Sequence, residues 1–329
     1  MKRRAFIWLV GGAAAAWPLA ARAQQTERVR RIGVLMRGSA DDSDEQARLT
    51  AFLQGLKEWG WSDGRNVRID VRWSAADPDR RRRYAAELVA LSPDVILADT
   101  STVVAALQQA TQTVPIVFAG VIDPVGAGFV ASLARPGGNT TGFASLDYGT
   151  SGKWLALLKE IAPRVTRAAI LRDPTIAAGI GQLAAIQAVA PALGVELSPL
   201  GARDAGEIER ELAAFPLGAN AGLIVTAAPS TGTHRDLIIA FAARHRLPAV
   251  YPFRYHVSSG GLISYGPDSL YGWRAAAGYI DRIVKGEKPA DLPVQAPTKF
   301  DLVINLKTAK ALGLELPASV LARADEVIE

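Results

Sequence analysis

Cysteine and histidine, the side chains most used for nucleophilic catalysis and for binding transition metals, are scarce in this 329-residue chain. There is no cysteine, which excludes disulfide bonds and thiol catalysis. The three histidines are His234, His245 and His256, and Pro248 and Pro252 keep the last two off one continuous helical face. With no H-x-x-x-H pair and no G-x-S-x-G sequence, the residues favour neither a metal site nor a hydrolase.

Hydroxyl side chains instead gather where a strand pattern gives way to a helix pattern. Thr100, Ser101 and Thr102 follow the apolar run DVILA and precede a helical pattern, and Ser230 stands in a similar place before His234. Backbone N–H groups exposed at such helix starts can hold a carboxylate or another anion. Helix capping is the simpler explanation of any single residue, so the argument rests on several loops taken together.

An amino-acid-like ligand would also need a carboxylate for its ammonium group and a flat surface for its side chain. Asp123 and Asp173 each end a strand pattern, although both precede proline and turn formation explains them equally well. Aromatic side chains could stack on a flat ligand, and we expect two of the following five to do so. They are Trp73, Tyr148, Tyr251, Phe253 and Tyr265.

The elements that must position these residues alternate between strand and helix. The first series has strands over 31–36, 67–73, 94–98 and 115–120, with helices over 44–59, 80–91 and 103–111. A short helix is expected before Pro136, and a strand leads to Asp147. The second series has strands over 168–171, 195–200, 222–227, 249–251 and 262–265, with helices over 176–193, 208–215 and 234–246. A further helix is expected over 270–284.

Two such series predict an α/β fold of two doubly wound lobes with parallel sheets, joined by a hinge. The similar entries RRIGVLMR and TRAAILRD suggest one architecture used twice. Parallel sheets place ligands beyond the carboxyl ends of their strands, so the lobes should enclose a cleft that closes by hinge motion. Residues just after each strand are the candidates to line it: 37–39, 99–102, 121–123, 173–175, 228–231, 253–255 and Tyr265. Within and beside these ranges we select Arg37, Ser39, Thr100, Ser101, Thr102, Asp123, Asp173, Thr175, Ser230, Tyr251, Phe253 and Tyr265 as ligand-binding residues.

The first 23 residues have the organisation of a secretory signal peptide. A basic start, Lys2 to Arg4, precedes an uncharged apolar run, and Ala21-Arg22-Ala23 supplies the small-x-small cleavage pattern. We expect export to the periplasm by the Sec or Tat route and cleavage after Ala23. The formal net charge is +5, and this segment carries four basic residues, which leaves +1 on the mature chain. That balance disfavours a nucleic-acid partner.

A dinucleotide site is the main enzymatic alternative. The stretch from Gly126 to Ala131 fits G-x-G-x-x-A, follows a strand pattern, and has Asp147 about 20 residues further on. Asp123-Pro124 separates the strand from the glycines, however, and Pro136 leaves room for only a short helix. We therefore disfavour an NAD-dependent oxidoreductase and expect no enzymatic activity and no cofactor.

Long motifs resemble one family of ABC importers. The segment FAGVIDPVGAGFVASLARPGGNTTGF, residues 118–143, closely resembles the signature of their periplasmic substrate-binding proteins of the tryptophan/tyrosine type. The resemblance continues through GGLISYG, residues 260–266, and through KGEKPADLPVQAPTKFDLVINLKTAKALGLELP, residues 285–317. It implies a type I periplasmic-binding fold that captures a small polar ligand, such as an amino acid or an aromatic acid. One departure is Asp99-Thr100-Ser101-Thr102, where related sequences often show a Gly-Thr-Pro-Ala-like turn, and it adds a carboxylate.

The resemblance also implies a partner, an ABC permease in the inner membrane. A signalling receptor is the alternative partner, because both uses need the same closure. We expect a monomer whose first lobe comprises residues 29–147 and about 268–288. The second lobe should comprise residues 148–267 and about 289–329.

Overall fold

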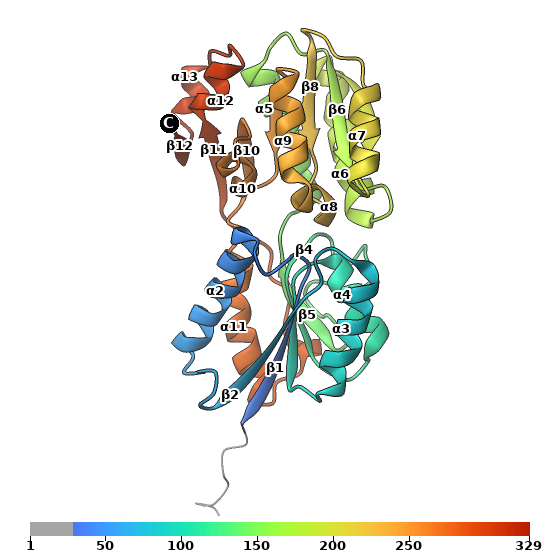
Figure 1. Cartoon of the computed structure of the whole chain (residues 1–329), viewed down its shortest axis with the longest axis vertical. Coiled ribbons are helices and arrows are strands. Elements are labelled where there is room, and N and C mark those ends of the chain that lie inside the picture. The colour runs from blue at the N-terminus through green and yellow to red at the C-terminus, as the bar shows by residue number, and fades with distance from the viewer. Residues whose placement is uncertain (1–28) are drawn as a thin grey trace, which may run out of the picture.

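The computed structural model describes residues 29–329, so the expected signal peptide lies outside the described residues. Two α/β lobes are stacked end to end, with the N-terminal lobe at the bottom of Figure 1. The first lobe holds a parallel sheet of order β2-β1-β3-β4-β5. Its strands are β1 (Arg30–Met36), β2 (Val67–Trp73), β3 (Val95–Ala98), β4 (Ile116–Val121) and β5 (Thr140–Ala144). Its helices are α2 (Ser43–Glu58), α3 (Pro78–Ala90), α4 (Ser101–Ala110) and α11 (Tyr271–Val284).

The second lobe holds a larger sheet of order β12-β11-β10-β9-β8-β6-β7. Its strands are β6 (Arg167–Arg172), β7 (Glu196–Gly201), β8 (Ala221–Val225), β9 (Ala249–Tyr251), β10 (Ile263–Pro267), β11 (Phe300–Asn305) and β12 (Glu326–Ile328). Its helices are α5 (Tyr148–Ile161), α6 (Ala177–Leu193), α7 (Ala205–Ala214), α8 (Pro229–Thr233), α9 (Arg235–Arg244), α10 (Arg254–Ser258), α12 (Leu306–Ala311) and α13 (Ala318–Leu321).

The two sheets repeat one strand order, which confirms the predicted doubly wound architecture used twice. In each lobe the second strand along the chain lies at one edge, and the first, third, fourth and fifth follow across the sheet. The second sheet adds a feature that the sequence did not predict, because β11 pairs antiparallel to β10. Pro267 at the end of β10 lies opposite Phe300 at the start of β11. The returning chain therefore enters beside the point where it left and has to run in the opposite direction.

The chain crosses between the lobes three times. It leaves the first lobe after β5, returns to it as α11, and α11 then packs beside α2 against the first sheet (Figure 1). A short 3-10 turn, η1 (Pro289–Asp291), and the residues after it also stay with the first lobe. There Gln295 N donates to the Gly142 carbonyl (3.0 Å), and Ala144 N donates to the Gln295 carbonyl (2.8 Å). The third crossing thus lies between Gln295 and β11, beyond the boundary expected near residue 288.

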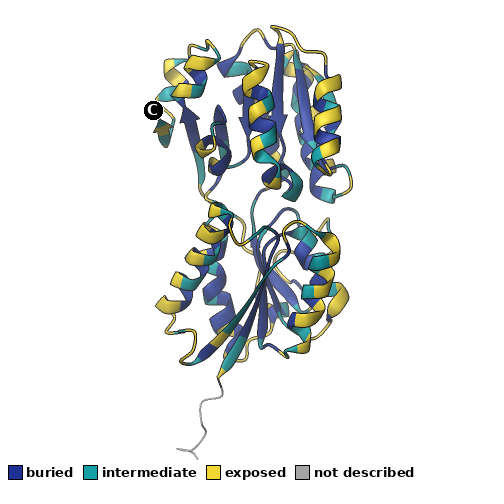
Figure 2. Cartoon of the chain, viewed as in Figure 1, coloured by how far each residue is buried: buried dark blue, intermediate teal, exposed yellow. Residues whose placement is uncertain are grey.

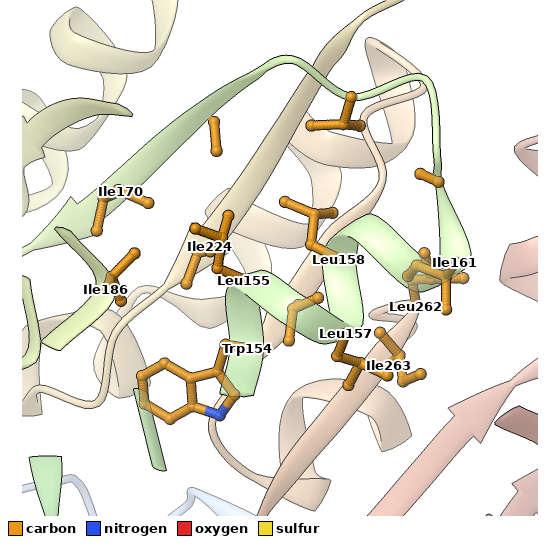
Figure 3. Close-up of a cluster of buried hydrophobic side chains, with 14 of the residues drawn as sticks. Trp154, Leu155, Leu157, Leu158, Ile161, Ile170, Ile186, Ile224, Leu262 and Ile263 are labelled. Atoms are coloured by element: carbon orange, nitrogen blue, oxygen red, sulfur yellow. The ribbon is translucent and has the colours of Figure 1, made fainter. Parts of the chain in front are cut away.

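Each lobe has its core where helices cover the faces of a buried sheet, as Figure 2 shows. In the second lobe, Trp154 of α5 is fully buried among Leu155, Leu158, Ile186 and Ile263 (Figure 3). Its indole N–H donates to the backbone carbonyl of Tyr265 over 2.7 Å, which satisfies the one polar atom of the side chain. Among residues 29–329, no helix is long and apolar enough to cross a membrane.

The segment between β4 and β5 forms turns, where the sequence predicted a short helix. Asp123 has a positive φ of 45°, and its carboxylate accepts a hydrogen bond from Gly126 N (2.8 Å), so the turn is closed locally. Gly128 then takes a φ of 74°, which an α-helix does not allow. The pattern from Gly126 to Ala131 therefore does not open the helix that a dinucleotide site requires.

Candidate functional site

A pocket lies between the lobes, at the carboxyl ends of both sheets. The first lobe contributes Arg37, Arg48, Asp99, Thr100, Ser101, Ala119, Gly120, Ile122, Ser145, Ser269 and Trp273. The second lobe contributes Ile176, Ala178, Ala228, Pro229, Phe253 and Tyr255. Because both lobes line it, the pocket would open or close with any hinge motion between them.

Four buried charges form the base of the pocket on the first lobe. Arg37 directly follows β1, and its Nε lies 3.1 Å from Glu45 Oε1 and 3.5 Å from Asp99 Oδ2. Its backbone N–H also donates to Asp99 Oδ2 over 3.2 Å. Arg48, one turn along α2 from Glu45, pairs with the same Glu45 oxygen. Two arginines and two carboxylates are thus held together with little access to water.

The two carboxyl groups of this cluster respond differently to burial. Burial raises the pKa of Asp99, the neighbouring Glu45 raises it further, and Arg37 and Arg48 only partly offset this, so the pKa is about 7. Burial also opposes ionisation of Glu45, but the charges of Arg37 and Arg48 outweigh it and lower the pKa of Glu45. Near neutral pH the cluster therefore carries a net charge between zero and +1, set by the proton on Asp99.

Helices α4 and α6 both begin at the pocket without a side-chain cap. Thr100 is the N-cap residue of α4 and Ile176 that of α6, and neither side chain accepts a hydrogen bond from the helix. The flanking helices α2, α3 and α7 are each capped by an aspartate side chain, from Asp42, Asp77 and Asp204. The two uncapped starts face the same pocket, so their N–H groups and partial positive charge are available to an anion there.

Three aromatic side chains supply the apolar part of the lining. Trp273 reaches the pocket from α11 of the first lobe. Phe253 and Tyr255 come from the second lobe and stack on one another, with ring centroids 5.5 Å apart. The guanidinium of Arg48 lies 5.4 Å from the Tyr255 ring centroid, so this ring also joins the two lobes.

Further polar contacts hold the lobes against each other. Arg37 Nη1 donates to the Pro229 carbonyl of the second lobe over 3.1 Å. Arg235 of α9 reaches across to the start of α2, where it pairs with Asp42 (3.1 Å) and Asp44 (3.3 Å). These contacts depend on the lobes being close together, so they belong to the closed arrangement of the cleft.

The structure brings four of the twelve selected residues into the pocket: Arg37, Thr100, Ser101 and Phe253. Thr102 stands beside them, with its hydroxyl 3.2 Å from that of Thr100. Ser39 and Ser230 lie near the pocket but outside its lining, in the loop after β1 and in the first turn of α8.

The candidates Asp123, Asp173 and Thr175 make hydrogen bonds to nearby protein groups and lie outside the pocket lining. The carboxylate of Asp123 accepts hydrogen bonds from Gly126 N and from the Tyr148 hydroxyl (2.6 Å), and it lies outside the pocket lining. Asp173 accepts from both the N–H and the hydroxyl of Thr175, which closes the turn after β6.

Most of the candidate aromatic residues lie away from the pocket. Tyr251 is fully buried in the core of the second lobe, where it stacks on His256. Tyr265 stacks on Phe300 in a separate hollow of that lobe. Of the five aromatic residues proposed to stack on a ligand, Phe253 is the one that lines the pocket.

Two of the large side chains in the lining, Arg48 and Trp273, come from within helices, where sequence reasoning did not look. Arg48 lies in α2, on the face that also carries buried Glu45 and Phe52. A charged pair at positions i and i+3 on the apolar face of an amphipathic helix was the available signal. Trp273 had no comparable signal, because its place depends on the return of α11 to the first lobe.

Two parallel-sheet lobes with this strand order and a shared pocket define the type I periplasmic-binding class. The chain belongs to the family of ABC transporter substrate binding proteins, whose model matches residues 31–328. A tyrosine-binding protein of Clostridioides difficile (strain R20291) is 26% identical over 265 residues, which is 80% of this chain and 76% of that protein.

Solved structures share this architecture. One, described as the ABC domain in complex with L-Trp from Streptococcus pneumoniae, has a TM-score of 0.83 at 26% identity and covers 91% of this chain and 99% of that chain. A conserved domain protein of Vibrio cholerae gives a TM-score of 0.81 at 26% identity, over 91% of this chain and 100% of that chain.

Proposed function

We propose that this substrate-binding protein captures an aromatic α-amino acid, of the size of L-tryptophan or L-tyrosine, in the pocket between its lobes. The observation that carries the proposal is the combination, in one pocket, of three aromatic side chains with two uncapped helix starts. The first suits an aromatic ring and the second a carboxylate. The relatives named for tyrosine and crystallised with L-Trp support the same ligand class.

The lining divides into two parts that match the two ends of such a ligand. Thr100 and Ser101 at the start of α4, with Arg48 close by, provide donors and positive charge for the ligand carboxylate. Trp273 and Phe253 come from opposite lobes and would enclose the side-chain ring between them when the cleft closes. Arg37 positions this surface through Glu45 and Asp99 and completes the contact with the second lobe.

Membership of this family suggests the role that ligand binding has in transport. We propose that the protein acts in the periplasm as a monomer, without catalysis, and passes its ligand to an ABC permease. The lobes would move as bodies about the three crossings, which lie after β5, before α11 and before β11. The family match and the named relatives favour this role over a receptor-coupled sensor or an oxidoreductase.

A thermal-shift titration tests the ligand class directly. L-tryptophan and L-tyrosine are compared with myo-inositol and NAD at equal concentration. A ligand at about 100 times its dissociation constant stabilises the native state by about 2.7 kcal/mol, which raises the unfolding midpoint by several degrees. We expect such a shift with one or both amino acids. A shift with myo-inositol or NAD alone would refute the proposal.

A further inference from the structure

Asp99 is the one carboxylate among the residues that line the pocket. It follows β3 directly and is nearly inaccessible to water, with 3% of the residue exposed. Its two oxygens are not equivalent. Oδ2 takes both contacts with Arg37, from the backbone N–H (3.2 Å) and from Nε (3.5 Å). Oδ1 makes no hydrogen bond with any of residues 29–329, and the atom retains some solvent-accessible surface. A buried carboxylate with one free oxygen at a pocket wall needs a donor from outside the protein.

We propose that Asp99 Oδ1 accepts a hydrogen bond from the α-ammonium group of the ligand, and that Asp99 thereby selects α-amino acids over carboxylic acids of the same shape. This inference rests on the proposed function, because it names how one end of the same ligand is recognised.

The charges around the pocket remain balanced when such a ligand binds. Arg37 and Glu45 neutralise one another, which leaves Arg48 and Asp99 as the remaining positive and negative charges. A bound zwitterion adds one charge of each sign and pairs with both. A carboxylic acid without the amino group adds a negative charge and offers nothing to Asp99. The aspartate would then have to stay protonated, or remain ionised with Oδ1 unpaired, and both are unfavourable above its pKa.

A proton should leave the pocket when an amino acid enters. The charged groups that act on Asp99 are Arg37, directly after β1, and Glu45 and Arg48 on α2; Tyr255 of α10 lines the same pocket. Because burial and Glu45 raise the pKa of Asp99 to about 7, the carboxyl group is about half protonated at that pH. An ammonium group at Oδ1 favours the carboxylate, so Asp99 releases its remaining proton to solvent.

Two ligand pairs and two variants test the inference by isothermal titration calorimetry. L-tryptophan is compared with indole-3-propionate, and L-tyrosine with 3-(4-hydroxyphenyl)propionate; each acid lacks only the amino group. The variant is Asp99→Asn, in which the side-chain oxygen can still accept from Arg37 N. The matched control is Asp94→Asn at the other end of the same strand, where the carboxylate also pairs with an arginine, Arg30 (3.1 Å).

We expect the wild-type protein to bind the amino acid at least tenfold more tightly than its acid analogue. Asp99→Asn should weaken amino-acid binding by about tenfold to a hundredfold, as for loss of a charged hydrogen bond, and leave the affinity for the acid unchanged or improved. Asp94→Asn should keep the wild-type ratio within about twofold. Titrations at pH 7 in buffers of different ionisation enthalpy should show proton release with the amino acid, and proton uptake or no exchange with the acid, whose negative charge favours the protonated form of Asp99.

The outcomes separate this inference from the proposed function. If neither amino acid binds the wild-type protein, the proposed function fails and the inference with it. If an amino acid and its acid analogue bind equally well, or if binding of the amino acid takes up protons, the ligand class stands and the role of Asp99 is refuted. If Asp99→Asn does not fold, the ratio of the wild-type affinities for the amino acid and its acid analogue still decides the matter.

Discussion

The contact of Arg235 with the start of α2 should add to ligand affinity without being needed for folding. Arg235 lies on α9 of the second lobe; two of its acidic partners, Asp42 and Asp44, lie on the first lobe, and the third, Asp236, lies next to it on α9. Opening the cleft separates Arg235 from Asp42 and Asp44 and returns these three charges to water. We therefore predict that Arg235→Gln destabilises the closed form relative to the open form and leaves each lobe intact.

The size of the effect follows from the exposure of the three side chains. Arg235 is 13% exposed, Asp42 24% and Asp44 33%, which places both pairs between exposed and buried. Exposed pairs contribute about 0.2–1 kcal/mol each, and hydrogen bonds to charged groups contribute somewhat more. Two such pairs give about 1.5 kcal/mol for closure, which corresponds to about a tenfold rise in the dissociation constant.

Calorimetric titration with the bound amino acid measures this change, and urea unfolding of the unliganded protein measures stability. Arg244→Gln is the matched control, because Arg244 is an exposed arginine at the end of the same helix. The effect should also shrink as the salt concentration rises. Equal affinities for the two variants would refute the reasoning. An equal loss of affinity and of unfolding free energy would also refute it, because Arg235 would then stabilise the fold and not the closure.

Three further changes test the core, a tight backbone approach and the buried acid. Trp154→Ala should lower the free energy of unfolding by about 3–5 kcal/mol in urea, and a loss below about 1 kcal/mol would contradict its central place in the core. Gly142→Ala should lower the free energy of unfolding by more than about 1 kcal/mol in the same assay, because φ is +152° and a Cβ atom would lie 2.1 Å from the Phe118 carbonyl oxygen. Gly138→Ala is the control and should be nearly neutral, because a Cβ atom there meets nothing within 4 Å. Asp99→Asn should become progressively more stable than the unliganded wild type as the pH rises from about 4 to 7, and the gap should level off above pH 7. The variant gains because burial and Glu45 raise the Asp99 pKa from 3.8 to about 7, so Asp99 ionises in the unfolded wild type at a lower pH than in the folded one. A stability difference between the variant and the wild type that narrows from about pH 4 to 7 would show that folding lowers the Asp99 pKa.

The sequence predicted most elements of the fold because strands and helices carry different periodicities. The strands at Val67–Trp73 and Ala249–Tyr251 have the predicted bounds. Helix α5 went unassigned, although Trp154, Leu158 and Ile161 recur at helical spacing. The antiparallel pairing of β10 with β11 could not be predicted, because it depends on where the chain re-enters the second lobe and not on any local pattern.

Part of the pocket was predictable for a simple geometric reason. Residues directly after parallel strands meet at one edge of the sheet, and by that rule Arg37 and Phe253 were expected where the pocket lies. The rule fails at the last residue of a strand, where side chains alternate between faces, and so Tyr251 points into the core. The rule considers only residues that follow strands, so it did not identify Arg48 and Trp273, which lie within helices.

The return of α11 to the first lobe has a consequence for the order in which the protein can fold. The strands of that lobe are complete once Ala144 has been synthesised, but the helix that buries their face follows only after residues 145–270. Trp273 and Ile280, which belong to the core of the first lobe, are therefore among the later residues to be made. The sheet of the second lobe is completed later still, when β11 and β12 have been synthesised. A chain shortened before residue 270 would lack a core helix of one lobe and two strands of the other, so the lobes cannot mature one after the other during synthesis as independent domains do.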